Sequence, residues 1–247
     1  MRWLPRSLSV PPHRRWIADI LHSGGTAHIV GADIAVNVAH IEAVRRSRPR
    51  PVSWVSISVR AAALAAAKWP ELRTAYLPFP WPRLYVHPVS SVTVLLERNW
   101  NGTRAVFFDT LKGAELSQVG QIDQWLRWLR HERVEGVGAF RRAIRIAKLP
   151  LLVRRLLWAT VQWSGRMRAR YIGNIAISSV APARFSVVQI SSPVSFTVFL
   201  GPVSPDGTMR IQLFADHRLV DGLAASRILE DIGRIVNTII VAELAAE

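Results

Sequence analysis

The run Ile211-Gln-Leu-Phe-Ala-Asp216-His-Arg-Leu-Val-Asp221-Gly222 places a histidine and two aspartates between two segments of different character. The apolar residues before it are typical of a buried strand, and the spaced apolar residues after it are typical of a terminal helix. A histidine at a strand end can act as a base near neutral pH if one tautomer is held. Gly222 would allow a tight entry of the backbone into the helix. The plain alternative is a loop in which His217 and Asp221 only cap that helix.

Length and composition predict one globular domain. The chain has 247 residues, of which 50% are hydrophobic and 20% charged, and this supplies one substantial core. No linker rich in serine, glycine or proline separates two compositions, so we predict a single domain over residues 1–247. The absence of cysteine excludes disulfides, thiolate metal sites and a cysteine nucleophile. The seven histidines show no metal-ligand spacing, and no metal is predicted.

The charge predicts an anionic partner. Lysine and arginine number 32 against 17 acidic residues, which gives a net charge of +15. Such a chain attracts a nucleic acid, an anionic membrane face or a phosphorylated cofactor. Nucleic acid is the least favoured of these, because no recognised nucleic-acid-binding motif accompanies the charge.

Neither a secretion signal nor a membrane span is predicted. The first residues carry charge but no continuous apolar segment before Pro11. The long uncharged stretch 185–205 contains Pro193, Gly201, Pro202 and Pro205, which indicates strands and turns. We expect a cytoplasmic protein, which would also lie at the inner membrane face if its basic helices bind lipid.

The order of the expected elements predicts an α+β fold. Several neighbours look like hairpins, notably the strands 89–97 and 103–109 on either side of the pair Asn101-Gly102, which suits a turn with positive φ. The prolines between residues 78 and 88 predict a loop. Regular βαβ alternation is missing, so a sandwich is favoured. The other expected strands are 28–36, 171–180, 185–190, 194–200 and 209–214, and the expected helices are 14–21, 38–46 after an Asn37 cap, 53–68, several within 117–170, and one from 222 onward.

The segment 125–170 concentrates the positive charge. It holds twelve basic and two acidic residues. One interpretation is a set of interfacial helices that bind an anionic membrane. The other is a set of amphipathic helices packed on their own domain with a solvated basic face. Three apolar stripes are expected there: Ile122, Trp125, Leu126 and Leu129; Phe140, Ala143, Ile144 and Ala147; and Leu152, Leu156, Ala159 and Trp163.

The string Asp216-His-Arg-Leu-Val-Asp-Gly222 resembles the active-site motif His-x-x-x-Asp-Gly of the chloramphenicol acetyltransferase and dihydrolipoyl acyltransferase superfamily. The form with Asp-His-Arg is that of acyltransferase subunits of 2-oxo acid dehydrogenase complexes. Weaker likenesses follow in the family's order: residues 14–21 resemble its Arg-Lys-x-Ile-Ala helix, 26–28 its Ile-Pro-His entry, 52–72 its Val-x-Asp-x-x-x-Lys-Ala helix, and 173–179 its Gly-Thr-Phe-Thr-Ile-Ser-Asn strand. The resemblance implies a two-layer α+β sandwich of the chloramphenicol acetyltransferase-like type, with a basic helical insertion at about 125–170.

The resemblance also implies a chemistry. The enzyme would move an acyl group from acyl-CoA, or from a lipoyl thioester, to an unknown thiol or hydroxyl acceptor. His217 would be the general base, and Ser178, or failing it Ser179, would donate a hydrogen bond to the oxyanion, which is worth roughly 3 kcal/mol of barrier. In this family the site lies between subunits of a trimer, with the histidine of one subunit facing the serine of the next. A homotrimer is therefore implied.

The supporting residues and the alternative role follow from the same likeness. Asp221 would hold the loop through an ion pair with Arg14 or Arg15, and Gly222 would open the helix. The family carries lipoyl and subunit-binding segments before its catalytic domain, whereas this sequence begins almost at the catalytic helix, which favours free acyl-CoA as the donor. The contrasting hypothesis is a trimeric scaffold without catalysis, which uses the basic Trp/Arg helices to bind a membrane or an acidic protein.

Overall fold

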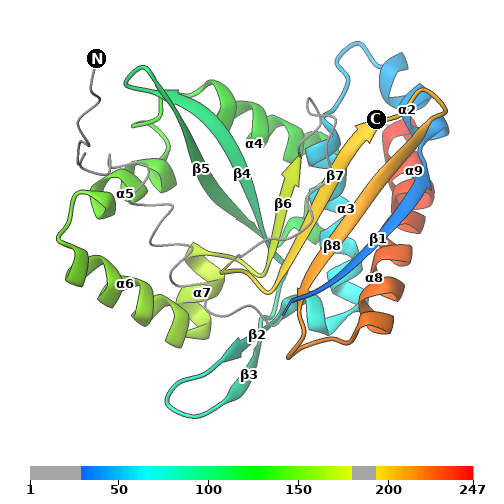
Figure 1. Ribbon diagram of the computed structural model, residues 1–247. Coiled ribbons are helices and arrows are strands. Elements are labelled where there is room, and N and C mark those ends of the chain that lie inside the picture. The colour runs from blue at the N-terminus through cyan, green and yellow to red at the C-terminus, as the bar shows by residue number, and fades with distance from the viewer. Residues whose placement is uncertain (1–28, 180–192, 247) are drawn as a thin grey trace, which may run out of the picture.

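The computed structural model describes residues 29–179 and 193–246, which form a six-stranded mixed sheet flanked by helices (Figure 1). The strands lie in the order β1-β8-β7-β6-β4-β5. The pairs β4–β6 and β6–β7 are parallel and the other pairs are antiparallel. The sheet consists of β1 (Ile29–Asn37), β4 (Ser91–Trp100), β5 (Thr103–Lys112), β6 (Ile175–Ser179), β7 (Phe196–Val203) and β8 (Thr208–Asp216).

Two groups of helices flank this sheet. The first group lies behind the sheet and to the side of β1 in Figure 1, and its central members contact β1, β4, β6 and β8. It consists of α2 (Ala39–Ser47), α3 (Trp54–Lys68), α8 (Gly222–Ile235), the π-helical turn η3 (Val236–Ile240) and α9 (Val241–Ala246). The second group lies on the side of β4 and β5 and consists of α4 (Val119–His131), α5 (Gly138–Ala147), α6 (Leu151–Trp163) and α7 (Gly165–Tyr171). The short 3₁₀ turns are η1 (Pro70–Arg73) and η2 (Ala114–Leu116).

The main core lies between the sheet and α3 and α8. Strand side chains alternate between the two faces of a sheet. In β8 the buried residues Met209, Ile211, Leu213 and Ala215 face the helices. The residues between them therefore lie on the other face, which we call the open face. The two-layer arrangement predicted from the sequence is confirmed.

Local signals explain several elements. Asn101 and Gly102 have φ values of 50° and 75° at the tip of the β4–β5 hairpin, as a tight turn between twisted strands requires. The Ser53 hydroxyl accepts from the Ser56 backbone N–H at 3.2 Å and caps α3. Asn37 Oδ1 accepts from the Ala39 N–H at 3.0 Å, although α2 begins only at Ala39. Each of these roles follows from residues adjacent in sequence.

The proline-rich loop prediction is wrong in part. Residues 74–86 form a separate antiparallel hairpin of β2 (Thr74–Leu77) and β3 (Arg83–Val86), and the prolines occupy only its turn. Strand β6 also begins later than predicted, because α7 continues to Tyr171 and the chain then turns through Gly173. The expected helix at 14–21 and the strand at 185–190 lie outside the described residues.

The predicted apolar stripes divide into two kinds. Those of α4 and α5 are largely buried against the domain, for example at Leu126, Leu129 and Phe140, while arginines occupy the outer faces. The stripe of α6 points outward instead, with Leu152 81% exposed and Leu156 62% exposed. Within the described part of the chain, no helix combines the length and the apolar character needed to cross a membrane.

Candidate active site

His217 stands at the end of β8, in the turn that leads into α8. Its Nδ1 lies 3.0 Å from the Val220 carbonyl oxygen and 3.5 Å from Asp221 Oδ1. A carbonyl can only accept, so the neutral ring carries its proton on Nδ1 and presents Nε2 as the basic nitrogen. The side chain is 52% exposed. The ring is therefore held in one tautomer and still reachable from solvent.

The turn around His217 is shaped by its two neighbours in the motif. Asp216 accepts the backbone N–H of Arg218 at 3.0 Å and its guanidinium at 2.9 and 2.7 Å. The same guanidinium stacks 4.1 Å above the Tyr76 ring of β2. Together these contacts raise the pKa of Arg218, mainly through the Asp216 hydrogen bonds. The hairpin β2–β3 thus supports the turn that carries the histidine.

A buried arginine from α7 lies beneath this turn. Arg168 donates to the carbonyl oxygens of Tyr76 and Pro193, at 3.2 and 2.9 Å, and contacts Ser195 Oγ at 3.4 Å. The Ser195 carbonyl in turn accepts the backbone N–H of Asp216 at 2.9 Å. Burial lowers the pKa of Arg168 to about 10, with attraction by Asp216 opposing this and repulsion by Arg218 adding to it. Arg168 positions the start of the histidine turn.

Sequence reasoning missed Arg168. It was one of twelve basic residues in the segment 125–170, and helical spacing alone gives it no special place. The signal is tertiary: the residue is 6% exposed, whereas Arg166 and Arg170 on the same helix are exposed. Only its contacts with β2 and with residues 193–195, just before β7, single it out.

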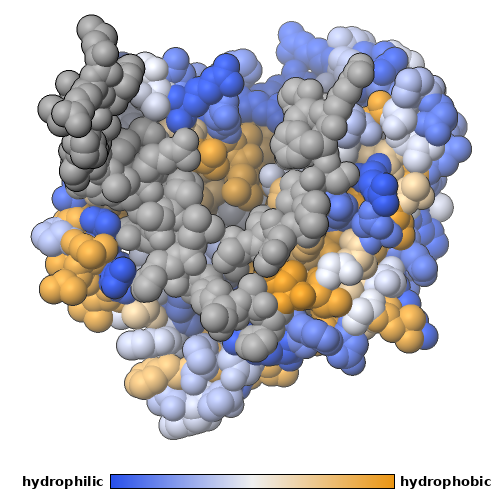
Figure 2. All heavy atoms as spheres, viewed as in Figure 1, coloured by the Kyte–Doolittle hydropathy of each residue, from blue (hydrophilic) through white to orange (hydrophobic). Residues whose placement is uncertain are grey.

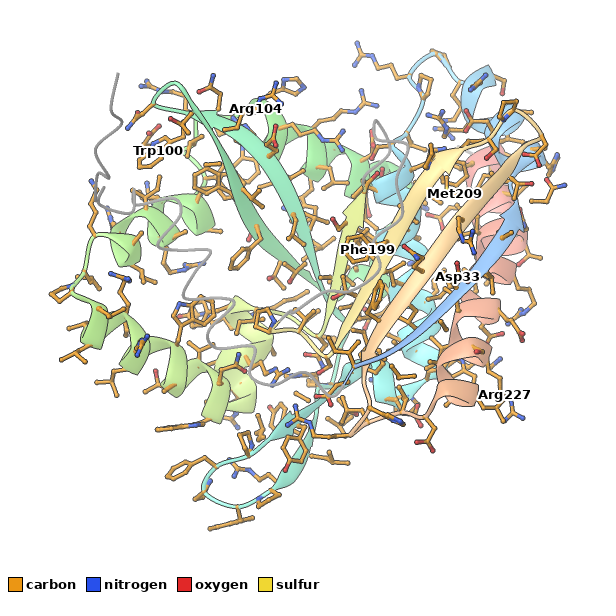
Figure 3. The ribbon with its side chains drawn as sticks, viewed as in Figure 1. Asp33, Trp100, Arg104, Phe199, Met209 and Arg227 are labelled. Atoms are coloured by element: carbon orange, nitrogen blue, oxygen red, sulfur yellow. The ribbon has the colours of Figure 1, made fainter. Side chains whose placement is uncertain are left out.

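Ser178 lies on the open face, in a row of register partners across the sheet. It pairs with Phe199 of β7, which pairs with Gln212 of β8, which pairs with Asp33 of β1. Figure 3 shows Phe199 and Asp33, which mark this row. Ser179 pairs with Leu200 and belongs to the helix-covered face. The register therefore favours Ser178 over Ser179 as the serine that faces outward from the sheet.

Ser178 and His217 do not meet within one chain. Ser178 is level with Gln212, and His217 follows five residues later along β8. At the rise of an extended strand, this separates them by about 15 Å along the strand direction, before the two intervening strand spacings are added. Ser178 is thus level with the middle of β8, whereas His217 lies just beyond the end of that strand.

Of the predicted supporting residues, the structure describes Asp221 and Gly222 only. Asp221 is 88% exposed and precedes α8, and its side chain makes no capping hydrogen bond. Its expected partners Arg14 and Arg15 lie outside the described residues. At Gly222 a Cβ atom would meet only Val30 Cγ2, at an ordinary 3.6 Å, so neither backbone conformation nor space requires glycine there.

Another hollow lies away from these residues. A cavity of about 220 Å³ sits between β5 and the helices α5, α6 and α7, and neither His217 nor Ser178 lines it. Asp109 lies on its wall, where burial raises the pKa of the carboxyl group. Across residues 29–179 and 193–246, no three His, Cys, Asp or Glu side chains are grouped so as to hold a metal ion.

Neither the protein-family models nor the curated protein sequences match this chain. Solved structures match it closely in fold. The core of Azotobacter vinelandii dihydrolipoamide acetyltransferase has a TM-score of 0.68 at 13% identity and covers 99% of this chain and 100% of its own. The truncated core of the Thermoplasma acidophilum 2-oxoacid dehydrogenase complex has a TM-score of 0.66 at 18% identity and covers 95% and 99%. Chloramphenicol acetyltransferase has a TM-score of 0.58 at 12% identity and covers 92% and 96%.

The class of the protein follows at the level of fold. The chain has the fold of the chloramphenicol acetyltransferase and dihydrolipoamide acetyltransferase cores, as the resemblance of the His217 motif predicted. The likeness runs through nearly the whole of each compared chain. At identities of 12 to 18%, the likeness establishes the fold but not the reaction, which must be argued from the site.

Proposed function

We propose that the protein is an acyltransferase, which moves an acyl group from acyl-CoA or a lipoyl thioester to a thiol or hydroxyl acceptor. The observation that carries the proposal is His217, held by Val220 in the tautomer that presents Nε2 while half of the side chain remains exposed. Its place between β8 and α8 is fixed by the Asp216 and Arg168 contacts. The proposal includes a cytoplasmic location, with which a chain lacking cysteine is compatible.

In this mechanism His217 Nε2 takes the proton of the acceptor as its oxygen or sulfur attacks the thioester carbonyl. Ser178 donates its hydroxyl hydrogen to the oxyanion of the tetrahedral intermediate. Collapse of the intermediate breaks the carbon–sulfur bond, and the imidazolium returns its proton to the leaving thiolate. The Nδ1 contacts with Val220 and Asp221 stabilise the ring while it is charged. No acyl-enzyme is required.

A compared structure supports the choice of residues. The Azotobacter vinelandii core was studied for the roles of a serine, a histidine and an asparagine in its catalytic mechanism, and its histidine and asparagine are four positions apart. His217 and Asp221 have the same spacing here. We assign Asp221 to the asparagine's place, where its carboxylate faces Nδ1.

A homotrimer is part of the proposal. Ser178 and His217 are about 15 Å apart along the strands of one chain, so a joint site needs the serine of a neighbouring subunit. In a closed ring of subunits, each subunit presents the same two surfaces, and each surface meets its complement on a neighbour. Coenzyme A, as the acyl donor, brings phosphates to a chain with a net charge of +15.

The test follows thiol release from a panel of acyl-CoA donors with thiol and hydroxyl acceptors. With hydroxyl acceptors a thiol reagent reports only released CoA, because the enzyme has no cysteine. With thiol acceptors one thiol is consumed for each CoA released, so chromatography of the acylated product measures the transfer instead. We expect His217→Ala to lower kcat by about 10² to 10⁴-fold, as loss of a general base does. Lys112→Ala, an exposed change outside the site, is the control. If the wild type and His217→Ala release thiol equally across the panel, the proposed reaction is wrong.

The second candidate is a trimeric scaffold without catalysis. One observation favours it: α6 exposes its leucine stripe instead of burying it. A scaffold would lose no function in His217→Ala but would depend on the α6 surface. The two candidates are therefore separated by variants at two different places.

A further inference from the structure

Exposed apolar side chains gather on one part of the molecule. In the described chain, seventeen large apolar side chains are exposed, and eleven of them belong to α6, to the β2–β3 hairpin or to Leu149, two residues before α6. Apolar patches of this extent on a monomer mark interaction sites. We call the members on the side of α6 the α6–hairpin surface: Leu149, Leu151, Leu152, Val153, Leu156, Leu157, Trp163, Phe79 and Trp81. Leu84 and Val86 alternate along β3 with the residues that face α6 and α7, and therefore lie on the other face of the hairpin.

The two parts of this surface are joined by direct contacts. The rings of Phe79 and Trp163 lie 4.5 Å apart between centroids. Arg83 donates to the carbonyl oxygens of Phe79 and Trp163, at 2.6 and 3.4 Å, and its guanidinium lies 6.0 Å from the Trp81 ring. In Figure 2 the hairpin at the lower edge and the α6 region at the left both show orange atoms beside blue ones. These contacts join the turn of the hairpin to the C-terminal end of α6.

Helix α6 turns an arginine toward the domain and its leucines toward solvent, the reverse of the usual arrangement. Arg154 and Trp158 face the domain and are 6% and 8% exposed, and Arg154 donates to the Leu149 carbonyl oxygen at 2.9 Å. The leucines point to solvent. The inner face of α6 already packs on the domain. The outward apolar stripe is therefore the side available for contact with a membrane. Its 13 residues are too few to cross a bilayer and enough to lie along one.

The two segments of chain that carry the surface contain only basic charges. The sequence contains no aspartate or glutamate between residues 136 and 205, and none between 72 and 96. Lys148, Arg155 and Arg166 are exposed beside the apolar side chains of α6. Arginine and lysine can extend their charged ends to lipid phosphates while leucine and tryptophan enter the headgroup boundary.

We propose that the α6–hairpin surface docks on an anionic lipid bilayer. The apolar stripe enters the interface, Trp81 and Trp163 lie at the headgroup level, and the basic side chains meet lipid phosphates. Helices α4 and α5 carry as much charge, but they bury their apolar stripes in the domain, and Trp128 is their one exposed large apolar side chain. The proposal does not depend on the acyl-transfer reaction.

The experiment measures co-sedimentation of the full chain with two kinds of vesicle. One is phosphatidylcholine alone and the other contains equal parts of phosphatidylcholine and phosphatidylglycerol. We expect binding to the anionic vesicles only, and a marked loss when salt is raised from about 0.1 M to about 1 M, because the screening length falls from about 10 to about 3 Å. Binding to both kinds of vesicle alike, or no salt effect, would overturn the electrostatic part and with it the proposal.

The decisive variants are a matched pair. Leu152 and Leu116 are each 81% exposed, but Leu116 lies in η2, away from the α6–hairpin surface. Leu152→Glu should bind anionic vesicles at least about tenfold more weakly, because a buried leucine is lost and a negative charge is added. Leu116→Glu should bind as the wild type does. Equal binding by the two variants would overturn the proposal.

The same measurements also show whether the α6–hairpin surface binds a second copy of the chain instead of a membrane. If the surface instead joins two copies of the chain, sedimentation will show Leu152→Glu with a lower mass than Leu116→Glu, and neither variant will differ in vesicle binding. Acyl transfer to a soluble acceptor should be the same in both variants, so failure here is distinct from failure of the proposed reaction. Trp81→Glu repeats the test on the hairpin, independently of α6.

Discussion

At the scale of single residues, burial decides which ionisable groups depart from their ordinary behaviour. His87 follows β3, is 2% exposed, and neither ring nitrogen has a hydrogen-bond partner among the described residues. Its ring meets Tyr85 edge-on at 4.8 Å. Burial lowers the pKa of His87 from 6.5 to about 4, and repulsion by Arg168 adds to this. The histidine is therefore neutral in the folded protein at any pH near 7.

This histidine makes stability depend on pH. Below pH 6.5 the unfolded chain binds a proton on His87, while the folded chain does so only near pH 4. Stability therefore falls as the pH falls through that window, by up to about 3 kcal/mol. We expect His87→Phe, which fills the same space without a titrating group, to remove this part of the slope in urea unfolding between pH 7 and pH 4.5. His131→Phe, at an exposed histidine, should leave the slope unchanged. Equal slopes for His87→Phe and the wild type would contradict the assignment.

At the scale of elements, one glycine sets the entry of β6. Gly173 has φ 77°, and a Cβ there would overlap Thr93 Oγ1 and the Ser91 carbonyl oxygen. Thr93 Oγ1 is already engaged, since it donates to the Ile172 carbonyl oxygen at 2.5 Å. The turn joins α7, which supplies Arg168, to β6, which supplies Ser178. Both ends of the candidate site therefore depend on this one backbone conformation.

We expect Gly173→Ala to destabilise the protein by at least about 2 kcal/mol, because strained backbone and steric overlap add. Urea unfolding measures the loss. Gly138→Ala is the matched control, since Gly138 has no positive φ and a Cβ there meets nothing within 4 Å. A Gly173→Ala protein as stable as Gly138→Ala would show that the turn can shift without cost.

The two hairpins and helix α6 show when a sequence pattern is enough to predict an element. The hairpin around Asn101-Gly102 was predicted because its turn is specified by two adjacent residues. The β2–β3 hairpin was not, because its strands are only four residues each and its turn is crowded with proline. The stripe of α6 was visible in the sequence, but periodicity says that a helix has two unlike sides and does not say which one meets the protein.

At the scale of the whole molecule, the candidate site is divided. His217 lies just beyond the end of β8 and Ser178 is level with the middle of that strand, two strands away, so one chain presents two halves that are too far apart to act on the same carbonyl. A site shared between subunits has a distinctive signature. Each defective subunit can supply the half that its neighbour lacks.

We therefore expect subunits carrying Ser178→Ala and subunits carrying His217→Ala to restore activity when they are co-expressed in equal amounts. Each site needs an intact histidine from one subunit and an intact serine from the next, so random assembly gives about a quarter of wild-type activity. The measurement is thiol release by the mixed preparation, compared with each variant alone. Activity no higher than the variants alone would mean that the serine and the histidine do not work across an interface.

Periodicity, turn chemistry and a motif of adjacent residues were enough to predict the fold, the order of most elements and the place of the histidine turn. The tertiary structure decided what depends on residues far apart in the chain. It put Ser178 and not Ser179 on the open face through strand register, buried Arg168 among a dozen similar cations, separated Ser178 from His217 within one chain, and turned the α6 stripe outward. Burial and register are sums over contacts between distant segments, and no local pattern contains them.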